Sequence, residues 1–229
     1  MGKMRKFANT SMLVLSGMLV MSGSSFAQRT AAILSRKDIT PNQISVASVV
    51  FALGCAVCLC LLPLLPGYFK FFVPILAAAL IQCRLLCNLF DGMVAVEGGK
   101  TTASGELYND IPDRVADPLI LIAAGYAAVS VAPDFAVMIG WLAGILAVFT
   151  AYVRTLCSSM GCPTDFRGPM AKQHRMAVMT FACVLSAFEW LIWNTSGYIL
   201  FIALLIIILG CLLTIWRRIK FAYNYLEKQ

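Results

Sequence analysis

Charged side chains are scarce in this chain. Only 13% of its 229 residues are Asp, Glu, Lys or Arg, whereas 60% are apolar, and the mean hydropathy is +0.83. Disorder is excluded because it needs low hydrophobicity and high charge. A water-soluble domain is excluded because it would expose large apolar patches. The length also excludes a transporter built from two six-helix halves, so the composition predicts an integral membrane protein.

Histidine is nearly absent, and the cysteines lack the pattern of a disulfide framework. The only histidine is His174, for which we expect no role. The nine cysteines are scattered through apolar segments, which favours buried free thiols. Cys55, Cys58 and Cys60 have a metal-like spacing, but they fall inside an apolar stretch with no histidine nearby. We therefore expect no zinc site there.

Positive charge exceeds negative charge, with 18 Lys and Arg against 11 Asp and Glu and a formal net charge of +7. These bases flank apolar runs instead of forming a basic stripe on a soluble surface. The sequence therefore predicts an anionic membrane face as the partner of these bases, and no nucleic acid.

Six stretches of about 20 residues are apolar enough to cross the hydrocarbon layer of a membrane. Short polar or turn-rich breaks separate them. The sequence therefore predicts an all-α membrane protein with six transmembrane helices. The stretches are 43–62, 70–95, 115–133, 135–156, 176–193 and 197–216.

The orientation of these helices follows from the Lys and Arg residues, which accumulate on the cytoplasmic side of a membrane. If both termini are cytoplasmic, the far side holds only Lys70. We expect a multi-pass protein of the cell (inner or plasma) membrane, with its polar site facing the cytoplasm. The bases on the cytoplasmic side are then Arg36, Lys37, Lys100, Arg114, Arg154, Arg167, Lys172, Arg175, Arg217, Arg218 and Lys220.

The first 27 residues imitate a secretory signal peptide, because basic residues precede the short apolar stretch 12–21. Cleavage, or an extra span there, would place Arg36 and Lys37 outside and invert every later loop. The sequence favours an N-terminal helix lying on the membrane interface, or a start codon assigned too far upstream. We expect an N-terminal segment at residues 1–39 and one six-span domain at residues 40–229.

Polar residues that could bind a ligand gather near the cytoplasmic end of the second predicted span. Asn88, Asp91 and Ala95 are spaced i, i+3, i+7, which places them on one face of a helix. After a break at Gly98 and Gly99, a further helix presents an acidic face of its own. That face holds Gly105, Asn109 and Asp113, and Asp110 lies on the adjoining stripe.

Carboxylate and amide oxygens are the ligands that Mg²⁺ prefers, and phosphate oxygens often complete its coordination. These residues therefore predict a metal site that binds a phosphate ester. Small residues on the same faces would let a nucleotide or pyrophosphate approach the backbone, and bases further along could hold a second anion. The small residues are Gly92, Ala95 and Gly105, and the bases are Arg154, Lys172 and Arg175.

This stretch resembles the signature of the CDP-alcohol phosphatidyltransferase family, D-x-x-D-G-x-x-A-R, eight residues, then G-x-x-x-D-x-x-x-D. The spacing matches throughout. Two further segments add to the resemblance. They are T-P-N-Q-I-S at Thr40 to Ser45 and G-P-M-A-K-Q-H-R at Gly168 to Arg175. Asp91, Gly92, Ala95, Gly105 and Asp113 stand as the pattern requires, whereas Asn88, Val96 and Asn109 replace an Asp, an Arg and an Asp.

The resemblance implies an enzyme of phospholipid biosynthesis. In that family two divalent cations, Mg²⁺ or Mn²⁺, bind the pyrophosphate of a CDP-linked lipid, usually CDP-diacylglycerol. An alcohol then attacks the phosphate that bears the lipid, and CMP leaves. The resemblance gives Asp113 the role of general base, and it implies a possible homodimer. The implied metal ligands are Asn88, Asp91, Asn109, Asp110 and Asp113, and the implied nucleotide contacts are Asn42, Gly92, Ala95 and Gly105.

The three replacements leave alternatives open. Asn88 and Asn109 remove two negative charges from the metal site, and Val96 removes a guanidinium that only Arg84 or Arg114 could replace. A relative that binds CDP-lipid without turnover is therefore a second hypothesis. A small transporter is disfavoured because its ion site would lie near the membrane midplane. We expect a phosphorylated alcohol as the acceptor, bound by the bases named above.

Overall fold

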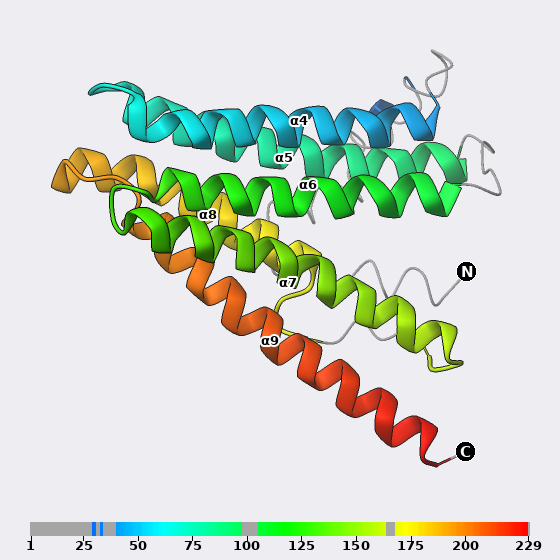
Figure 1. Cartoon of the computed structure of the whole chain (residues 1–229). Coiled ribbons are helices and arrows are strands. Elements are labelled where there is room, and N and C mark those ends of the chain that lie inside the picture. The colour runs from blue at the N-terminus through cyan, green and yellow to red at the C-terminus, as the bar shows by residue number, and fades with distance from the viewer. Residues whose placement is uncertain (1–28, 31–32, 34–39, 98–104, 164–167, 229) are drawn as a thin grey trace. The chain divides into compact units, whose positions relative to one another are not determined.

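The structure is a computed structural model, and it describes residues 29, 30, 33, 40–97, 105–163 and 168–228. Regular secondary structure in these residues is entirely helical (Figure 1). One short 3-10 helix, η1, follows the first long helix. In chain order the elements are α4 (Pro41–Leu61), η1 (Leu62–Leu64), α5 (Phe69–Glu97), α6 (Gly105–Ala127), α7 (Pro133–Ser159), α8 (Lys172–Trp193) and α9 (Tyr198–Leu226).

Within the described ranges, α4, α5, α7, α8 and α9 are long and apolar enough to cross a membrane. The prediction of an all-α, multi-pass membrane protein is confirmed, and each of these helices matches one predicted span. The predicted third span, 115–133, overlaps the second half of α6, which has 23 residues. Asp110, Asp113, Arg114 and Asp117 keep α6 out of the apolar set, so its crossing stays a prediction.

The predicted ends of two spans were wrong. Helix α6 ends at Ala127, whereas the predicted span was 115–133, although its start at Gly105 agrees with the helix expected to carry Gly105, Asn109 and Asp113. Helix α9 continues to Leu226, ten residues past the predicted end. The length of an apolar stretch indicates which part of a helix can lie in lipid. The helix itself can continue into water, because residues such as Glu, Arg and Lys favour helical structure. Helix α6 also runs without a break through Pro112, although proline lacks the N–H that a helix interior uses.

The chain forms two compact units. Unit 1 contains residues 1–51 and 82–113, and unit 2 contains residues 52–81 and 114–229. The predicted interfacial helix within residues 1–39 lies outside the described residues, apart from residues 29, 30 and 33. The separation of residues 1–39 from a domain at 40–229 stays a prediction.

Helix α4, whose first residues belong to unit 1, begins with a capping box. The backbone N–H of Gln43 donates to Thr40 Oγ1 at 3.3 Å, and the backbone N–H of Thr40 donates to Gln43 Oε1 at 3.0 Å. Pro41 follows Thr40 at the first helical position, where its missing N–H costs nothing. The T-P-N-Q sequence therefore starts this helix in a defined place.

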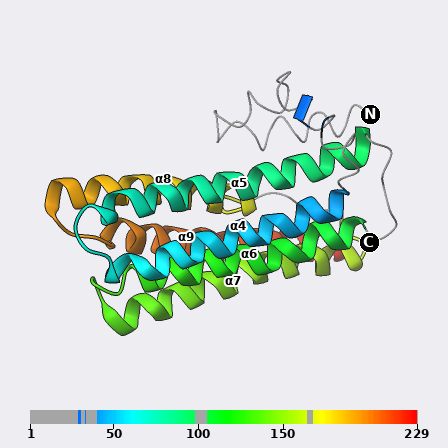
Figure 2. The same ribbon diagram turned by 90° about the horizontal axis from the view of Figure 1, so that it is seen from above.

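In unit 2, α9 packs against α7 and α8. Helices α7 and α9 run side by side in Figure 1, and α8 lies next to α9 in Figure 2. Helices α6 and α7 approach so closely that a Cβ atom on Gly125 would lie 2.7 Å from the backbone oxygen of Ala136. The same Cβ atom would lie 2.8 Å from Gly140 Cα, so glycine is required where these helices meet.

Gly125→Ala should destabilise the protein by about 1–3 kcal/mol, because backbone atoms would have to move apart. Gly54→Ala is the matched control. A Cβ atom on Gly54 would make only an ordinary contact, 3.5 Å from Leu80 Cδ1, so this change should be neutral or stabilising. Thermal unfolding in detergent measures both variants, and equal stability of the two would contradict the close approach of α6 and α7.

Glu189 is a buried acid within the span formed by α8, and it caps the next helix. Its carboxylate accepts hydrogen bonds from the backbone N–H groups of Tyr198 and Ile199, each at 3.1 Å. A carboxylate at a helix N-terminus satisfies amides that have no partner within the helix. Glu189 therefore has a structural role at the start of α9.

Candidate active site

Asp113 of α6 lies buried in unit 1, and side chains from α5 hold its carboxylate. Arg84 Nη2 donates to Asp113 Oδ1 at 2.8 Å, and Asn88 Nδ2 donates to the same oxygen at 2.9 Å. The side chain of Arg84 is 0% exposed and that of Asp113 is 7% exposed. Two donors that share one oxygen fix the orientation of the carboxylate, which is what a positioned general base needs.

One face of α5 supplies these contacts. Arg84, Asn88 and Asp91 are spaced i, i+4, i+7, so they form a stripe along that helix. The structure thus brings the predicted ligands Asn88 and Asp113 into direct contact, with Asp91 one turn further along α5. Arg84 was considered in the sequence only as a substitute for Val96. Its position one turn before Asn88 was the signal that it belongs to this site.

Asp91 is also buried, and α4 supplies its partner. Ser45 Oγ donates to Asp91 Oδ2 at 2.6 Å, and both residues are less than 5% exposed. Sequence reasoning treated Ser45 only as the end of the T-P-N-Q-I-S start and missed this contact. Because the Thr40 capping box sets where α4 begins, it also sets the position of Ser45 one turn later.

The ligand roles of Asn88, Asp91 and Asp113 stay predictions, as do those of the other predicted site residues of unit 1. Gly92 has open space beside it, since a Cβ atom on this residue would meet no described atom beyond its own helix backbone within 4 Å. Asn109 lies in α6, but its side chain is outside the described ones. The remaining predicted residues, which are Asn42, Ala95, Gly105 and Asp110, are half-buried.

A second buried polar network lies in unit 2 around Arg175. Arg175 Nη2 donates to Asp117 Oδ2 at 2.8 Å, and Arg175 Nη1 donates to Thr150 Oγ1 at 3.1 Å and to the Met170 carbonyl at 3.0 Å. Arg218 Nη1 donates to the Thr150 carbonyl at 2.6 Å. This network joins the buried guanidinium groups of Arg175 and Arg218 to the buried carboxylate of Asp117 through Thr150 and Arg175.

The predicted acceptor residues differ in their surroundings. Arg175 is buried within the network, whereas Arg154 of α7 and Lys172 of α8 are half-buried. Arg218 belongs to the same network as Arg175, although sequence reasoning used it only to orient the membrane spans. The signal in the sequence was that Arg218 directly follows the apolar stretch 197–216. The acceptor role of Arg154, Lys172 and Arg175 stays a prediction.

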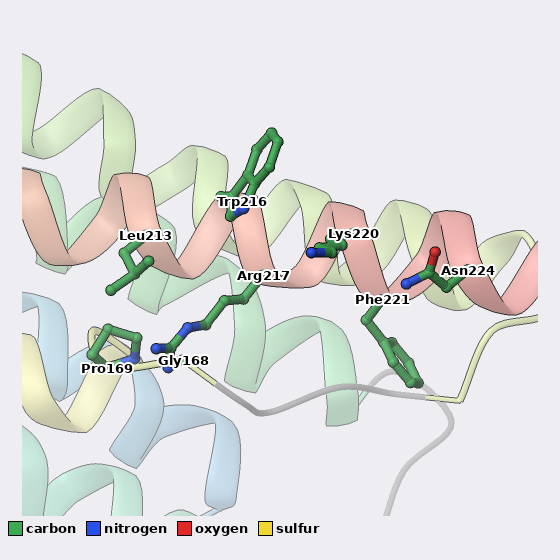
Figure 3. Close-up of a pocket in the computed structure, with 8 residues that line it drawn as sticks. All are labelled: Gly168, Pro169, Leu213, Trp216, Arg217, Lys220, Phe221 and Asn224. Carbon is green, nitrogen blue, oxygen red and sulfur yellow. The ribbon is translucent and has the colours of Figure 1, made fainter.

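A pocket of about 820 Å³ lies in unit 2, between α9 and the segment at Gly168 and Pro169 (Figure 3). Arg217 extends from α9 toward Pro169 in that view. Next to this pocket, the backbone N–H of Met170 donates to Thr214 Oγ1 at 3.0 Å, which holds the segment at Gly168 and Pro169 against α9. None of the described lining residues is a predicted site residue. They are Gly168, Pro169, Leu213, Trp216, Arg217, Lys220, Phe221 and Asn224.

The donors of unit 1 can be compared with the two divalent ions that the resemblance implies. Asp91 and Asp113 supply two negative charges, and Arg84 opposes them with one positive charge. Among the described residues, no three His, Cys, Asp or Glu side chains gather as possible ligands of an ion. One Mg²⁺ or Mn²⁺ fits, because one or two carboxylates with phosphate oxygens and water usually hold Mg²⁺. A second ion does not fit the described donors.

Comparison with solved structures shows which known proteins have a similar fold. The chain superposes on phosphatidylinositol phosphate synthase of Mycobacterium tuberculosis with CDP-DAG bound, with a TM-score of 0.72 and 17% identity. The match covers 87% of this chain and 94% of the synthase. This chain has the fold of that synthase. The resemblance to the CDP-alcohol phosphatidyltransferases is therefore confirmed at the level of the fold, over nearly the whole length of both chains.

Two further structures of the synthase give the same result. The form in complex with manganese and citrate has a TM-score of 0.70 at 17% identity, and the match covers 86% of this chain and 88% of the synthase. The apo form has a TM-score of 0.67 at 18% identity, with 85% and 95% covered. No protein-family model matches the sequence, and no curated protein matches it either.

Proposed function

We propose that this chain is a membrane transferase that moves a phosphatidyl group from CDP-diacylglycerol, or a similar CDP-linked lipid, to an alcohol, with release of CMP. One observation supports this above all others. The acid that aligns with the family's general base, Asp113, is buried and oriented by Arg84 and Asn88. The fold around it is that of a synthase whose structure contains CDP-DAG.

In the proposed reaction, the Asp113 carboxylate accepts the proton of the acceptor hydroxyl. The hydroxyl oxygen then forms a bond to the phosphorus that bears the lipid, and the bond from that phosphorus to the bridging oxygen of the pyrophosphate breaks. CMP leaves with the electron pair of that bond. A divalent ion, Mg²⁺ or Mn²⁺, held by Asp91 and the side-chain oxygen of Asn88, would neutralise charge on the pyrophosphate when bound.

Each neighbour of Asp113 has a part in this scheme. Arg84 forms an ion pair with the Asp113 carboxylate, and Asn88 donates a hydrogen bond to the same Asp113 oxygen. Ser45 holds Asp91 in place on the next turn of α5. Gly92, Ala95, Gly105 and Asn42 are proposed to lie against the nucleotide, and Asn109 and Asp110 are proposed as further oxygen donors.

We propose an anionic acceptor, such as a phosphorylated alcohol. The basic side chains of Arg154, Lys172 and Arg175 support this proposal, because guanidinium and ammonium groups bind phosphate. Arg154 and Lys172 are proposed to bind the same acceptor. The distribution of Lys and Arg supports a site that faces the cytoplasm.

The test is CMP release by the full-length chain, purified in detergent, from CDP-diacylglycerol with Mg²⁺ or Mn²⁺. Inositol, inositol phosphate, glycerol 3-phosphate and serine form the acceptor panel. Release that depends on one acceptor is expected, and a phosphorylated acceptor should be preferred. If no acceptor supports release, the transferase proposal fails.

The second candidate function is binding of CDP-lipid without turnover. Asn88, Val96 and Asn109 favour it, because they replace two acids and an Arg of the family pattern. Measurable binding of CDP-diacylglycerol, without CMP release for any acceptor, would support this candidate over the transferase.

A further inference from the structure

The position of Arg84 bears on how many metal ions the site can hold. Its guanidinium is fully buried and donates to the Asp113 oxygen that also accepts from Asn88. A metal ion that coordinated this oxygen would compete with both donors. A dication beside Arg84 would also be repelled by the guanidinium, most strongly in a buried site of low dielectric.

We propose that this site takes one divalent ion instead of two, and that the Arg84 guanidinium stands in the place of the second ion at Asp113. The proposal rests on the proposed function, since the pyrophosphate of a CDP-lipid would complete the coordination of the remaining ion. Asp91 and Asn88, on the same face of α5 as Arg84, hold that ion.

The charge balance of the site supports this assignment. Compared with the family pattern, Asn88 and Asn109 remove two negative charges, which is the charge of one divalent ion. Val96 removes one positive charge, and Arg84 supplies one positive charge from a different position on α5. Counted over the acid and Arg positions of the pattern together with Arg84, a site with one ion fewer therefore has the same net charge as the pattern with two ions. Buried charges need such a balance because each unpaired one is costly.

Arg84 contacts Asp113 directly. The 2.8 Å distance from Arg84 Nη2 to Asp113 Oδ1 is that of a charge-assisted hydrogen bond. Arg84 contributes this charge permanently, whereas an ion must be captured from solution. The donor lipid therefore meets a site in which part of the positive charge is already in place.

The number of bound Mn²⁺ ions tests the proposal without reference to activity. Electron paramagnetic resonance counts bound Mn²⁺ on the purified full-length chain saturated with CDP-diacylglycerol. We expect one Mn²⁺ per chain for the wild type and none for Asp91→Asn. Arg84→Gln should gain a second Mn²⁺, because it removes the competing donor and charge at Asp113. Arg84→Lys, which keeps the charge, should stay at one.

Two results would overturn the proposal. One is a count of two Mn²⁺ for the wild type, and the other is a count of one for folded Arg84→Gln at saturating Mn²⁺. If Arg84→Gln folds poorly, its unfolding temperature gives a second readout, which should rise with Mn²⁺ more than that of the wild type. Failure of the wild type to bind CDP-diacylglycerol would contradict the proposed function instead, so the two failures are distinguishable.

Discussion

Asp113→Asn should lower acceptor-dependent CMP release by roughly 10²- to 10⁴-fold, which is the usual contribution of a general base. The amide has nearly the shape of the carboxylate but cannot accept the proton of the acceptor hydroxyl. Initial rates at saturating CDP-diacylglycerol and acceptor measure the effect. Asp134→Asn is the matched control, because Asp134 is an exposed acid in the first turn of α7, and its rate should equal that of the wild type.

Loss of the Asp113 charge also leaves Arg84 without its carboxylate partner, so the chemistry has to be separated from folding. The double variant Arg84→Gln with Asp113→Asn removes both charges of the pair and should recover stability, but not turnover. Asp113→Asn with wild-type turnover would exclude this residue as the base. A double variant that regained turnover would show that the loss came from an unpaired charge.

Asp117→Asn should destabilise the protein by about 3–5 kcal/mol, because it leaves the buried guanidinium of Arg175 without its ion pair. Both side chains are 2% exposed, and Arg175 Nη2 lies 2.8 Å from Asp117 Oδ2. Arg175 also holds the Thr150 hydroxyl and the Met170 carbonyl, so strain at this point would spread to α7 and to the segment before α8. Unfolding in mixed micelles of rising SDS content measures the change.

The apolar pair Asp117→Leu with Arg175→Met is the control for this prediction. Replacement of a whole buried ion pair by apolar residues of similar volume is often neutral or stabilising. This double variant should therefore unfold near the wild type, even though it loses more polar contacts than the single variant. If the single and double variants are equally unstable, the cost lies in packing and not in the unpaired charge.

The length of the apolar stretches predicted α4, α5, α7, α8 and α9, because crossing a membrane needs about 20 apolar residues whatever the fold. The same criterion found only the second half of α6 and placed its end six residues too late. The first half of α6 carries Asp110, Asp113 and Arg114, which are too polar for lipid. These side chains still allow a helix, because neighbouring helices can satisfy them, as α5 does for Asp113.

Within the candidate site, spacing predicted which residues share a helix face. Asn88 and Asp91 lie one turn apart on α5, and the contact between Asn88 and Asp113 agrees with the expectation of two facing helices. Spacing did not reveal that Arg84 pairs with Asp113, or that Ser45 holds Asp91. Both partners come from other helices, and sequence separation says nothing about such contacts.

The sequence by itself determined that this is an all-α membrane protein, and it located the stretch that holds the candidate site. It did so because hydrophobic length and helical period are properties of single segments. Only the tertiary structure decided which buried charges form pairs, namely Arg84 with Asp113 and Arg175 with Asp117. The physical reason is that pairing depends on the rotation of each helix about its own axis and on its shift along that axis relative to the neighbouring helix. Packing of side chains between helices sets both of these.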